Sequence, residues 1–463
     1  MGIKLKQIKY VIRLTYFQKA ITLYLKESAF QYIMRRFIMK PTQFIDTFKN
    51  KSYLQSSLMF MLFFASWSIW WSFFQIWLTS DSNGLGLSGG KVGIIYSANS
   101  FVTLILMFIY GVIQDKLVIK RTLLVFCSLF STFVGPFFIW LYAPFIQHHF
   151  WLGVILGSIF LSCGFLAAVS AYEAVGERFS RYFNFKYGQA RAWGSFGYAV
   201  MALVAGYTFV INPHLNFWLG SLIGLILLLT ILFWKSDEEV NAKERIEDNK
   251  EEAAPSLSRI ISLLKVKDLW IIIIFITFSW SFYTIFDQQM FPDFYTKLFS
   301  SSSVGQQMYG TLNSVQVFVE ALMMGIVPII MAKIGVRKTL LLGATVMFLR
   351  IGLCGIAQGP ISVSFIKMFH ALEVPLFVLP IFRYITLHFD TKLSATIYMV
   401  GYSVSAQVGQ IILSGPLGTL RDHIGYQPTF FVISTIVLLA GIFAFITLRK
   451  DNEYVYGDPF VKE

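Results

Sequence analysis

Residues 116–124 read KLVIKRTLL, and residues 333–341 read KIGVRKTLL. The two stretches share their pattern of basic and apolar positions, and the second follows the first by 217 residues, nearly half of the chain. Each stretch stands between two long apolar segments, so each is expected to be a short loop between membrane helices. Such an internal repeat predicts two similar halves with parallel topology.

Twelve apolar segments are long enough to cross a membrane, which takes about 20 residues. The expected spans are 54–79, 92–113, 121–144, 150–176, 189–211, 214–234, 269–297, 307–332, 339–357, 361–386, 393–418 and 427–448. Only 14% of the residues are charged, against about 25% in soluble proteins. The sequence therefore predicts an all-α membrane protein with twelve transmembrane helices in two pseudo-symmetric six-helix halves.

A polar, charge-mixed stretch separates the sixth span from the seventh and divides the chain. The expected parts are a basic N-terminal extension (1–50), a first six-helix half (51–234), a cytoplasmic linker (235–268), a second six-helix half (269–449) and a cytoplasmic tail (450–463). Two hypotheses account for residues 1–38. In the first, they are a dispensable tail or the product of an upstream start, with Met34 and Met39 as alternative starts. In the second, they form a helix on the membrane surface.

Lys and Arg are distributed unequally among the loops. With the N-terminus inside, the internal loops hold eighteen of them and the external loops hold three, namely Lys91, Lys297 and Arg421. Because positively charged loops stay on the cytoplasmic side, both termini are expected in the cytoplasm.

Eight ionisable side chains fall within the expected spans. They are Glu173, Arg191, Asp287, Glu320, Arg350, Lys367, His370 and Glu373. An unpaired charge at membrane depth costs about 2.5–3.5 kcal/mol, so these groups are expected to face one another or a water-filled cavity. Lys367, His370 and Glu373 follow at intervals of three and share one helix face. Because an apolar environment favours the neutral form of a carboxyl group, this trio predicts a proton site.

The charges of this set nearly cancel. When His370 is neutral, four carboxylates outnumber three permanent cations by one. One proton on one carboxylate would make the set neutral, which is the balance of a carrier of one proton. The count assumes that all seven groups share one cavity, and it leaves open which carboxylate takes the proton.

Nothing in the sequence predicts an enzyme. It contains no nucleophile–base pair, metal-ligand cluster or phosphate-binding loop. The three cysteines stand singly in apolar runs without a CxxC motif, which argues against a zinc site or a disulfide framework. We therefore expect no cofactor, no metal and no nucleic-acid partner, and a monomer in the lipid bilayer.

Two parallel six-helix halves with a site between them are the architecture of the major facilitator superfamily. Gly111, Asp115 and Lys116 resemble the loop signature that follows the second span in this superfamily, although Val118 stands where a second Gly is usual. Longer segments resemble the oligosaccharide:proton symporters, which include the lactose permeases, and most closely the sucrose permease branch. These segments are 63–72, 189–198, 280–289 and 370–375.

The resemblance covers about 50–450 and implies roles for individual residues. Glu173 and Arg191 match a pair that binds the sugar, and Tyr198 occupies the place of an aromatic that stacks on a sugar ring. Glu373 matches the carboxyl that takes the transported proton. The remaining matches are Arg350, which tunes that carboxyl, His370, which links the sugar and proton sites, Tyr283 near the proton site, and the charge pair Asp287–Lys367.

Two departures from the lactose permeases alter the expected sugar site. Val317 stands where those permeases have an acidic residue, and Glu320 follows one turn later. With Gln316 and Asn313, Glu320 is expected to bind the sugar from the second half. A second charge pair is absent, because Thr284 and Ala406 occupy both of its positions.

The resemblance implies a proton-coupled symporter of a bacterial cell membrane that imports a disaccharide or small oligosaccharide by alternating access. Sucrose is the expected substrate. Raffinose, melibiose, lactose and maltose-like glucosides stay open as alternatives. An uncoupled facilitator or antiporter on the same fold and a sugar sensor without flux are the other functions considered.

Overall fold

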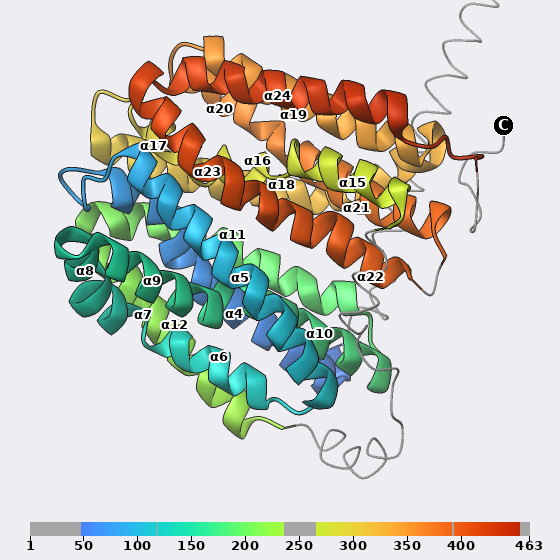
Figure 1. The fold of residues 1–463 in the computed structure, drawn as a ribbon. Helices are drawn as coiled ribbons and strands as arrows, with labels where there is room; N and C mark the ends of the chain where they lie inside the picture. The colour runs from blue at the N-terminus through green and yellow to red at the C-terminus, as the bar shows by residue number, and fades with distance from the viewer. Residues whose placement is uncertain (1–47, 118, 236–264, 391–392, 454–463) are drawn as a thin grey trace, which may run out of the picture. The chain divides into compact units, whose positions relative to one another are not determined.

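The computed structural model describes residues 48–117, 119–235, 265–390 and 393–453 (Figure 1). Val118, almost all of the expected N-terminal extension, most of the expected linker and the end of the expected tail lie outside the described residues. The chain divides into two units, Met1–Leu54 and Gln55–Glu463. In the first unit, the Tyr53 backbone N–H donates to Asn50 Oδ1 at 2.9 Å and caps the first described helix.

The first half of the sequence forms helices at all six expected spans. They are α4 (Lys51–Thr79), α5 (Gly89–Leu117), α6 (Thr122–Thr132), α7 (Val134–Pro136), η2 (Phe137–Tyr142), α8 (Ala143–His148), α9 (Phe150–Leu161), η3 (Ser162–Leu166), α10 (Ala168–Tyr182), α11 (Tyr187–Ile211) and α12 (Pro213–Phe233). The third span bends by 49° between α6 and α7. Pro136 accounts for the bend, because it cannot donate to the carbonyl four residues earlier.

The second half repeats this pattern with more interruptions. Its elements are α15 (Lys267–Thr277), α16 (Phe282–Ile285), α17 (Phe291–Thr296), α18 (Ser302–Ile334), α19 (Val336–Ile356), α20 (Pro360–Met368), α21 (His370–His388), α22 (Ser394–Tyr398), η4 (Met399–Val404), α23 (Ser405–Ile424) and α24 (Tyr426–Thr447). Figure 1 draws this half in yellow to red and the first half in blue to green.

The all-α membrane fold is confirmed, whereas the count of twelve spans is not fully confirmed. Within the described ranges, ten helices are long and apolar enough to cross a membrane, or eleven if the bent third span counts as one. The remaining expected span, 393–418, is helical from Ser394 to Ile424 but does not qualify by composition. Its α23 is rich in Ser, Gln and Gly and packs against α5 and α15.

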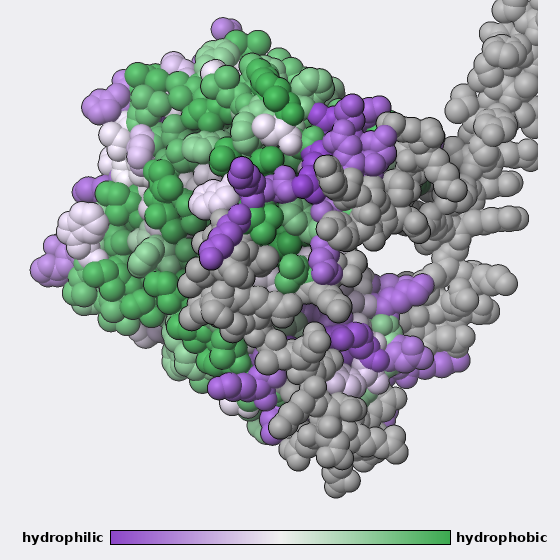
Figure 2. Space-filling model, turned by 45° about the vertical axis from the view of Figure 1, so that its right-hand side comes forward, coloured by the Kyte–Doolittle hydropathy of each residue, from purple (hydrophilic) through white to green (hydrophobic). Residues whose placement is uncertain are grey.

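Large apolar side chains cover much of the molecular surface, and Figure 2 shows one such face with hydrophilic groups at both of its edges. Trp140, Trp151, Ile211, Phe233 and Ile361 are among the many large apolar residues that are more than half exposed. Such a surface is unfavourable in water and is the surface that lipid chains require.

The seventh expected span, 269–297, is broken where a continuous helix was expected. Residues 278–281 and 286–290 form turns on either side of the short α16. Asp287 lies in the second turn. A helix can open in this way within a membrane only where protein or a cavity surrounds the freed backbone groups, so the break marks a site.

The tenth expected span is interrupted at Phe369, between α20 and α21. Pro375 lacks the N–H that would donate to the carbonyl of Ala371, which loosens the first turn of α21. Lys367 therefore lies in the last turn of α20, and His370 begins α21. The three ionisable groups of this span do not stand on one uninterrupted helix.

The two halves approach closely where α5 meets α23 and where α11 meets α18. The Asp422 carboxylate accepts from the backbone N–H groups of Gly89 and Gly90, at 2.8 and 2.7 Å. Burial raises the pKa of Asp422, but bonds from the Arg421 side chain and these two N–H groups hold it below its usual range. An ionised Asp422 thus joins α23 to the start of α5.

Small residues permit both approaches. A Cβ at Gly93 would lie 2.2 Å from the Ser414 carbonyl oxygen, and a Cβ at Gly310 would lie 2.9 Å from Gly206 Cα. Because both obstacles are backbone atoms, a larger side chain at either glycine must separate the two helices.

We predict that Gly93→Leu opens the contact between α5 and α23. In a Gln288→Cys background, a membrane-impermeant maleimide added outside intact cells should label the cavity faster when Gly93→Leu is present. The native Cys127, Cys163 and Cys354 are buried, so they should contribute little background. Gly188→Leu is the control, because a Cβ there meets no atom within 4 Å. Unchanged labelling in Gly93→Leu would contradict the prediction.

Candidate functional site

A cavity of about 260 Å³ lies between helices of the two halves. α4 and α11 supply one wall, and the α16–α17 segment, α18, α20 and α21 supply the other. Its lining residues are Phe64, Trp67, Trp71, Ser72, Arg191, Ser195, Tyr198, Tyr283, Asp287, Gln288, Pro292, Tyr309, Asn313, Gln316, Val317, Glu320, Lys367 and His370. The cavity thus combines aromatic faces with hydrogen-bonding groups, which is the composition of a site for a polar organic ligand with apolar faces.

Two of the expected sugar-binding residues form an ion pair on the wall of the first half. Arg191 Nε donates to Glu173 Oε1 at 2.9 Å, and the guanidinium lies 4.1 Å from the centre of the Phe64 ring. Arg191 lines the cavity, whereas Glu173 is not one of the lining residues. The pairing orients the guanidinium through its Nε, which is not one of the two terminal nitrogens.

The three expected residues of α18 also line the cavity. Gln316 Nε2 donates to Glu320 Oε2 at 2.8 Å, and Asn313 Nδ2 lies 3.5 Å from Ser72 Oγ on α4. Asn313 thus connects the two walls. Tyr198 faces the same cavity from α11.

Arg350 forms the centre of a buried ionic network. Its Nε and Nη2 donate to the two oxygens of Glu373 at 2.7 and 3.0 Å. Its Nη1 and Nη2 donate to the two oxygens of Asp287 at 2.8 and 2.7 Å. The side chains of Arg350 and Glu373 are 0% exposed, so water does not screen these contacts.

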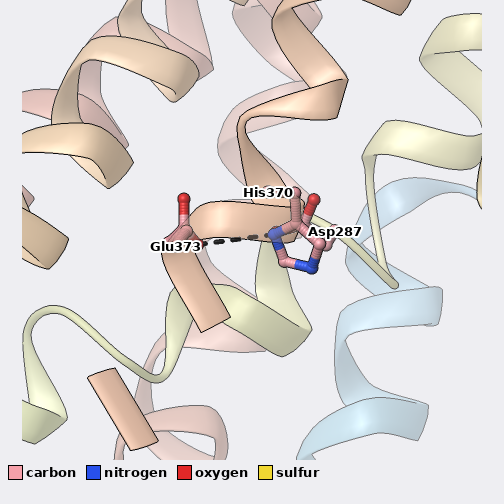
Figure 3. Close-up of side chains that lie close together, drawn as sticks. All are labelled: Asp287, His370 and Glu373. Carbon is pink, nitrogen blue, oxygen red and sulfur yellow. Dashed lines mark ion pairs between the residues drawn. The ribbon is translucent and has the colours of Figure 1, made fainter. Parts of the chain in front are cut away.

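Lys367 and His370 complete this network. Lys367 Nζ donates to Asp287 Oδ1 at 2.6 Å. The His370 ring stacks on Tyr283 with 5.3 Å between centroids, and its Nδ1 lies 3.3 Å from Asp287 and 3.5 Å from Glu373 (Figure 3). The expected Asp287–Lys367 pair and the expected Glu373–Arg350 pair therefore belong to one cluster, joined by Arg350.

Asp287, His370 and Glu373 offer three possible metal-ligand atoms within 4.8 Å of one another. Arg350 and Lys367 already donate to every oxygen of the two carboxylates. Two cations and two carboxylates make the cluster neutral when His370 is uncharged. A divalent cation would have to displace the guanidinium, so the arrangement fits an internal ion-pair network better than a metal site.

The charge count assumed that all seven charged groups share one cavity. In the structure they fall into three sets, and only four of them line the cavity. Arg191 and Glu173 form one neutral set. The Arg350 network forms a second neutral set. Glu320 forms the third set without an ion pair among the described residues, and the single excess negative charge resides there.

The expected loop motif lies away from the cavity. Asp115 pairs with Arg178 of α10 at 2.5 Å, and Lys116 is exposed at the end of α5. Gly111 is also exposed, and a Cβ there would meet no atom within 4 Å. In the second half, Gly335 occupies the position that Val118 holds in the first, and its φ of 92° fits the helix end that a Gly serves there.

The sequence did not identify most of the cavity wall on α4. Phe64, Trp67 and Trp71 line the cavity. Trp70 of the same helix is buried, at 1% exposure, and does not line it. The dense run of aromatics in the first span was the available signal. Such residues often anchor a helix at the membrane surface, and only the packing of α4 separates a cavity wall from an anchor. The Trp67 indole N–H is buried without a hydrogen-bond partner among the described residues.

Comparison with known proteins gives consistent results. The model of a family described as LacY proton/sugar symporter matches residues 45–458. A sucrose permease of Escherichia coli is 42% identical over 409 residues, which cover 88% of this chain and 96% of the permease. A raffinose permease of Escherichia coli is 34% identical over 89% of this chain and 96% of its own length. A crystal structure of the nucleoside transporter NupG covers 86% of this chain and 99% of its own with a TM-score of 0.71 at 14% identity, which supports the fold alone.

We predict that the network tolerates loss of a pair better than loss of one charge. Asp287→Asn leaves Lys367 buried without its carboxylate, and breaking such a pair costs about 3–5 kcal/mol. Asp287→Asn combined with Lys367→Met restores neutrality and should raise the free energy of unfolding above that of Asp287→Asn alone.

Thermal unfolding of the purified protein in detergent measures both effects. Asp268→Asn is the control, because Asp268 pairs with Arg449 where both side chains are partly exposed, and such pairs contribute at most about 1 kcal/mol. Additive destabilisation in the double variant would contradict the network.

Proposed function

Because this chain belongs to the family of LacY proton/sugar symporters, we propose that it imports a disaccharide together with a proton and that sucrose is the substrate. The observation that carries the proposal is the cavity between the halves, in which aromatic and hydrogen-bonding side chains lie beside a buried ionic network. The 42% identity to a sucrose permease supports sucrose over the sugars named for the less similar permeases.

The sugar binds between the two walls of the cavity. Arg191, held by Glu173, donates to neighbouring hydroxyl groups, since a guanidinium fork suits two adjacent acceptors. Tyr198 and the aromatics of α4 cover the apolar faces of the sugar rings. Glu320, Gln316 and Asn313 bond further hydroxyl groups from α18.

Glu373 and Arg350 carry out proton release. A carboxylate that accepts two bonds from a guanidinium is stabilised in its ionised form. When Arg350 pairs with Glu373 in this way, the proton has left that carboxyl. His370 lines the cavity, stacks on Tyr283 and lies 3.5 Å from Glu373, which supports a link between the sugar and proton sites.

Transport proceeds by alternating access, in which the two halves, 51–234 and 269–449, rock about the cavity. The contacts of α5 with α23 and of α11 with α18 close one entrance. The linker 235–268 connects the halves in the cytoplasm, both termini lie there, and the monomer is the working unit.

One proton moving through 100 mV contributes about 2.3 kcal/mol, which corresponds to roughly 50-fold accumulation with one proton per sugar.

We predict that sucrose makes the medium more alkaline when it is added to lightly buffered, de-energised cells that express this chain. The proton enters with the sugar, so an external pH electrode records the coupling directly. Glu373→Gln should abolish the pH rise. Glu177→Gln should preserve it, because Glu177 is an exposed carboxylate paired with Arg181 on the surface of α10.

The other functions give different results in the same assay. Entry of labelled sucrose without a pH change would replace symport with an uncoupled facilitator. A pH rise with raffinose, melibiose or lactose but not with sucrose would keep symport and change the substrate.

Trp67 provides a test of the cavity as the sugar site. Trp67→Phe keeps the aromatic face and removes the indole N–H, so sugar binding should weaken by about 1 kcal/mol, roughly fivefold. Trp70→Phe is the matched control, because its N–H is also buried without a partner among the described residues but does not line the cavity. Equilibrium binding to the purified variants measures both, and equal effects would contradict the assignment.

A further inference from the structure

Two polar contacts join the halves near the end of α4 and at the start of α5. In the α4 contact, the backbone N–H of Asp293 on α17 donates to Gln75 Oε1 at 2.9 Å. In the α5 contact, the Asp422 carboxylate of α23 accepts from the backbone N–H groups of Gly89 and Gly90. Both contacts lie on the side that the proposed orientation places outside the cell, because α4 then runs outward.

Side chains of the second half connect the two contacts. The Asp293 carboxylate accepts from the Tyr426 hydroxyl, and that hydroxyl accepts from Arg421 Nη1 at 2.8 Å. Arg421 Nη2 in turn donates to Asp422 Oδ1 at 2.6 Å. A continuous chain of bonded groups therefore starts on α4, passes through α17, α24 and α23, and ends on α5.

The charges of this chain are paired within the second half. Lys297 Nζ bonds Asp293 Oδ2 at 2.7 Å, and Arg421 pairs with Asp422. The groups of the first half that take part are neutral, namely the Gln75 amide and two backbone N–H groups. When the halves separate, each carboxylate keeps its cation. Separation thus costs hydrogen bonds to neutral groups and creates no unpaired buried charge.

The buried end of the chain borders the cavity. Gln75 is 1% exposed, and it follows the cavity residue Trp71 by one helical turn. Asp293 is 4% exposed, and it comes directly after the cavity residue Pro292. Opening the cavity between α4 and α17 must therefore break the α4 contact.

We propose that the α4 and α5 contacts form one latch on the outer side of the cavity, which opens as a unit because Arg421 and Tyr426 connect them. A bonded Asp422 orients Arg421, and Arg421 orients the hydroxyl that holds Asp293. Loss of either contact therefore weakens the other, as expected within one hydrogen-bond network. The inference rests on the proposed function only in that the halves separate on this side; it does not depend on the sugar or the proton.

A double-mutant cycle in the Gln288→Cys background tests the latch. Gln75→Met removes the acceptor of the α4 contact, and Asp422→Asn removes the charge and one acceptor of the α5 contact. Each should speed labelling by an impermeant maleimide outside intact cells by about fivefold, because labelling follows the fraction of open molecules. Because the contacts are coupled, the double variant should be accelerated by less than the product of the two single effects.

Repeating the cycle in Tyr426→Phe tests the connection itself. This change removes only the hydroxyl and keeps the ring against Phe294 and Phe430, so the fold should persist. The two contacts then act independently, and their effects on the labelling rate should multiply. Arg421→Gln interrupts the same connection at its other member and should give the same result.

Two variants serve as controls for the chemistry of the substitutions. Asp81→Asn neutralises an exposed carboxylate just beyond α4, and Tyr207→Phe removes the hydroxyl of a tyrosine that is exposed on α11. Both should label at the rate of the Gln288→Cys parent.

Three results would overturn the latch. They are unchanged labelling in Gln75→Met and Asp422→Asn, effects that multiply in the parent as well as in Tyr426→Phe, and coupling that persists in Tyr426→Phe. Gly93→Leu separates failure of the latch from failure of the proposed function. If it speeds labelling where the latch variants do not, the halves separate and only the latch is wrong. If it has no effect either, the opening assumed by the proposed function fails together with the latch.

Discussion

The pairing of one buried guanidinium with two carboxylates is the constraint on which the site depends. Arg350 is fully buried on α19, and its donors meet oxygens of both Asp287 and Glu373. A guanidinium keeps its charge at any physiological pH, so the low-dielectric interior must supply its partners. Those partners come from two other spans. The charge of Arg350 thus ties α19 to α21 and to the turn that holds Asp287.

The interrupted helices follow from this requirement. A continuous seventh span would keep Asp287 within a regular helix, whereas the turn at 286–290 places it where Arg350 and Lys367 both reach its oxygens. The interruption at Phe369 similarly separates Lys367 from Glu373. Backbone irregularity at membrane depth is tolerated beside a cavity. Both interruptions lie beside the cavity between the halves, because Asp287, Lys367 and His370 line it.

Closure of the cavity depends on backbone contact and not on charge alone. Gly93 and Gly310 let helices of the two halves touch at their main chains, and Asp422 bonds the first N–H groups of α5. A transporter that opens and closes needs contacts that are close enough to exclude solutes and weak enough to separate. Close packing of small residues with a few polar bonds meets both requirements. The excess charge at Glu320 lies inside the space that these contacts close.

The sequence by itself determined the membrane class, the helical spans of both halves and the set of intramembrane charges, because apolar length and the cost of a buried charge are properties of local composition. It did not reveal that Asp287 pairs with Arg350 and Lys367 together, that Trp67 and Trp71 form a cavity wall, or that Glu320 has no cationic partner among the described residues. These facts depend on distances between residues far apart in the chain. Only the tertiary structure decided them, because a sequence lists charges but does not pair them.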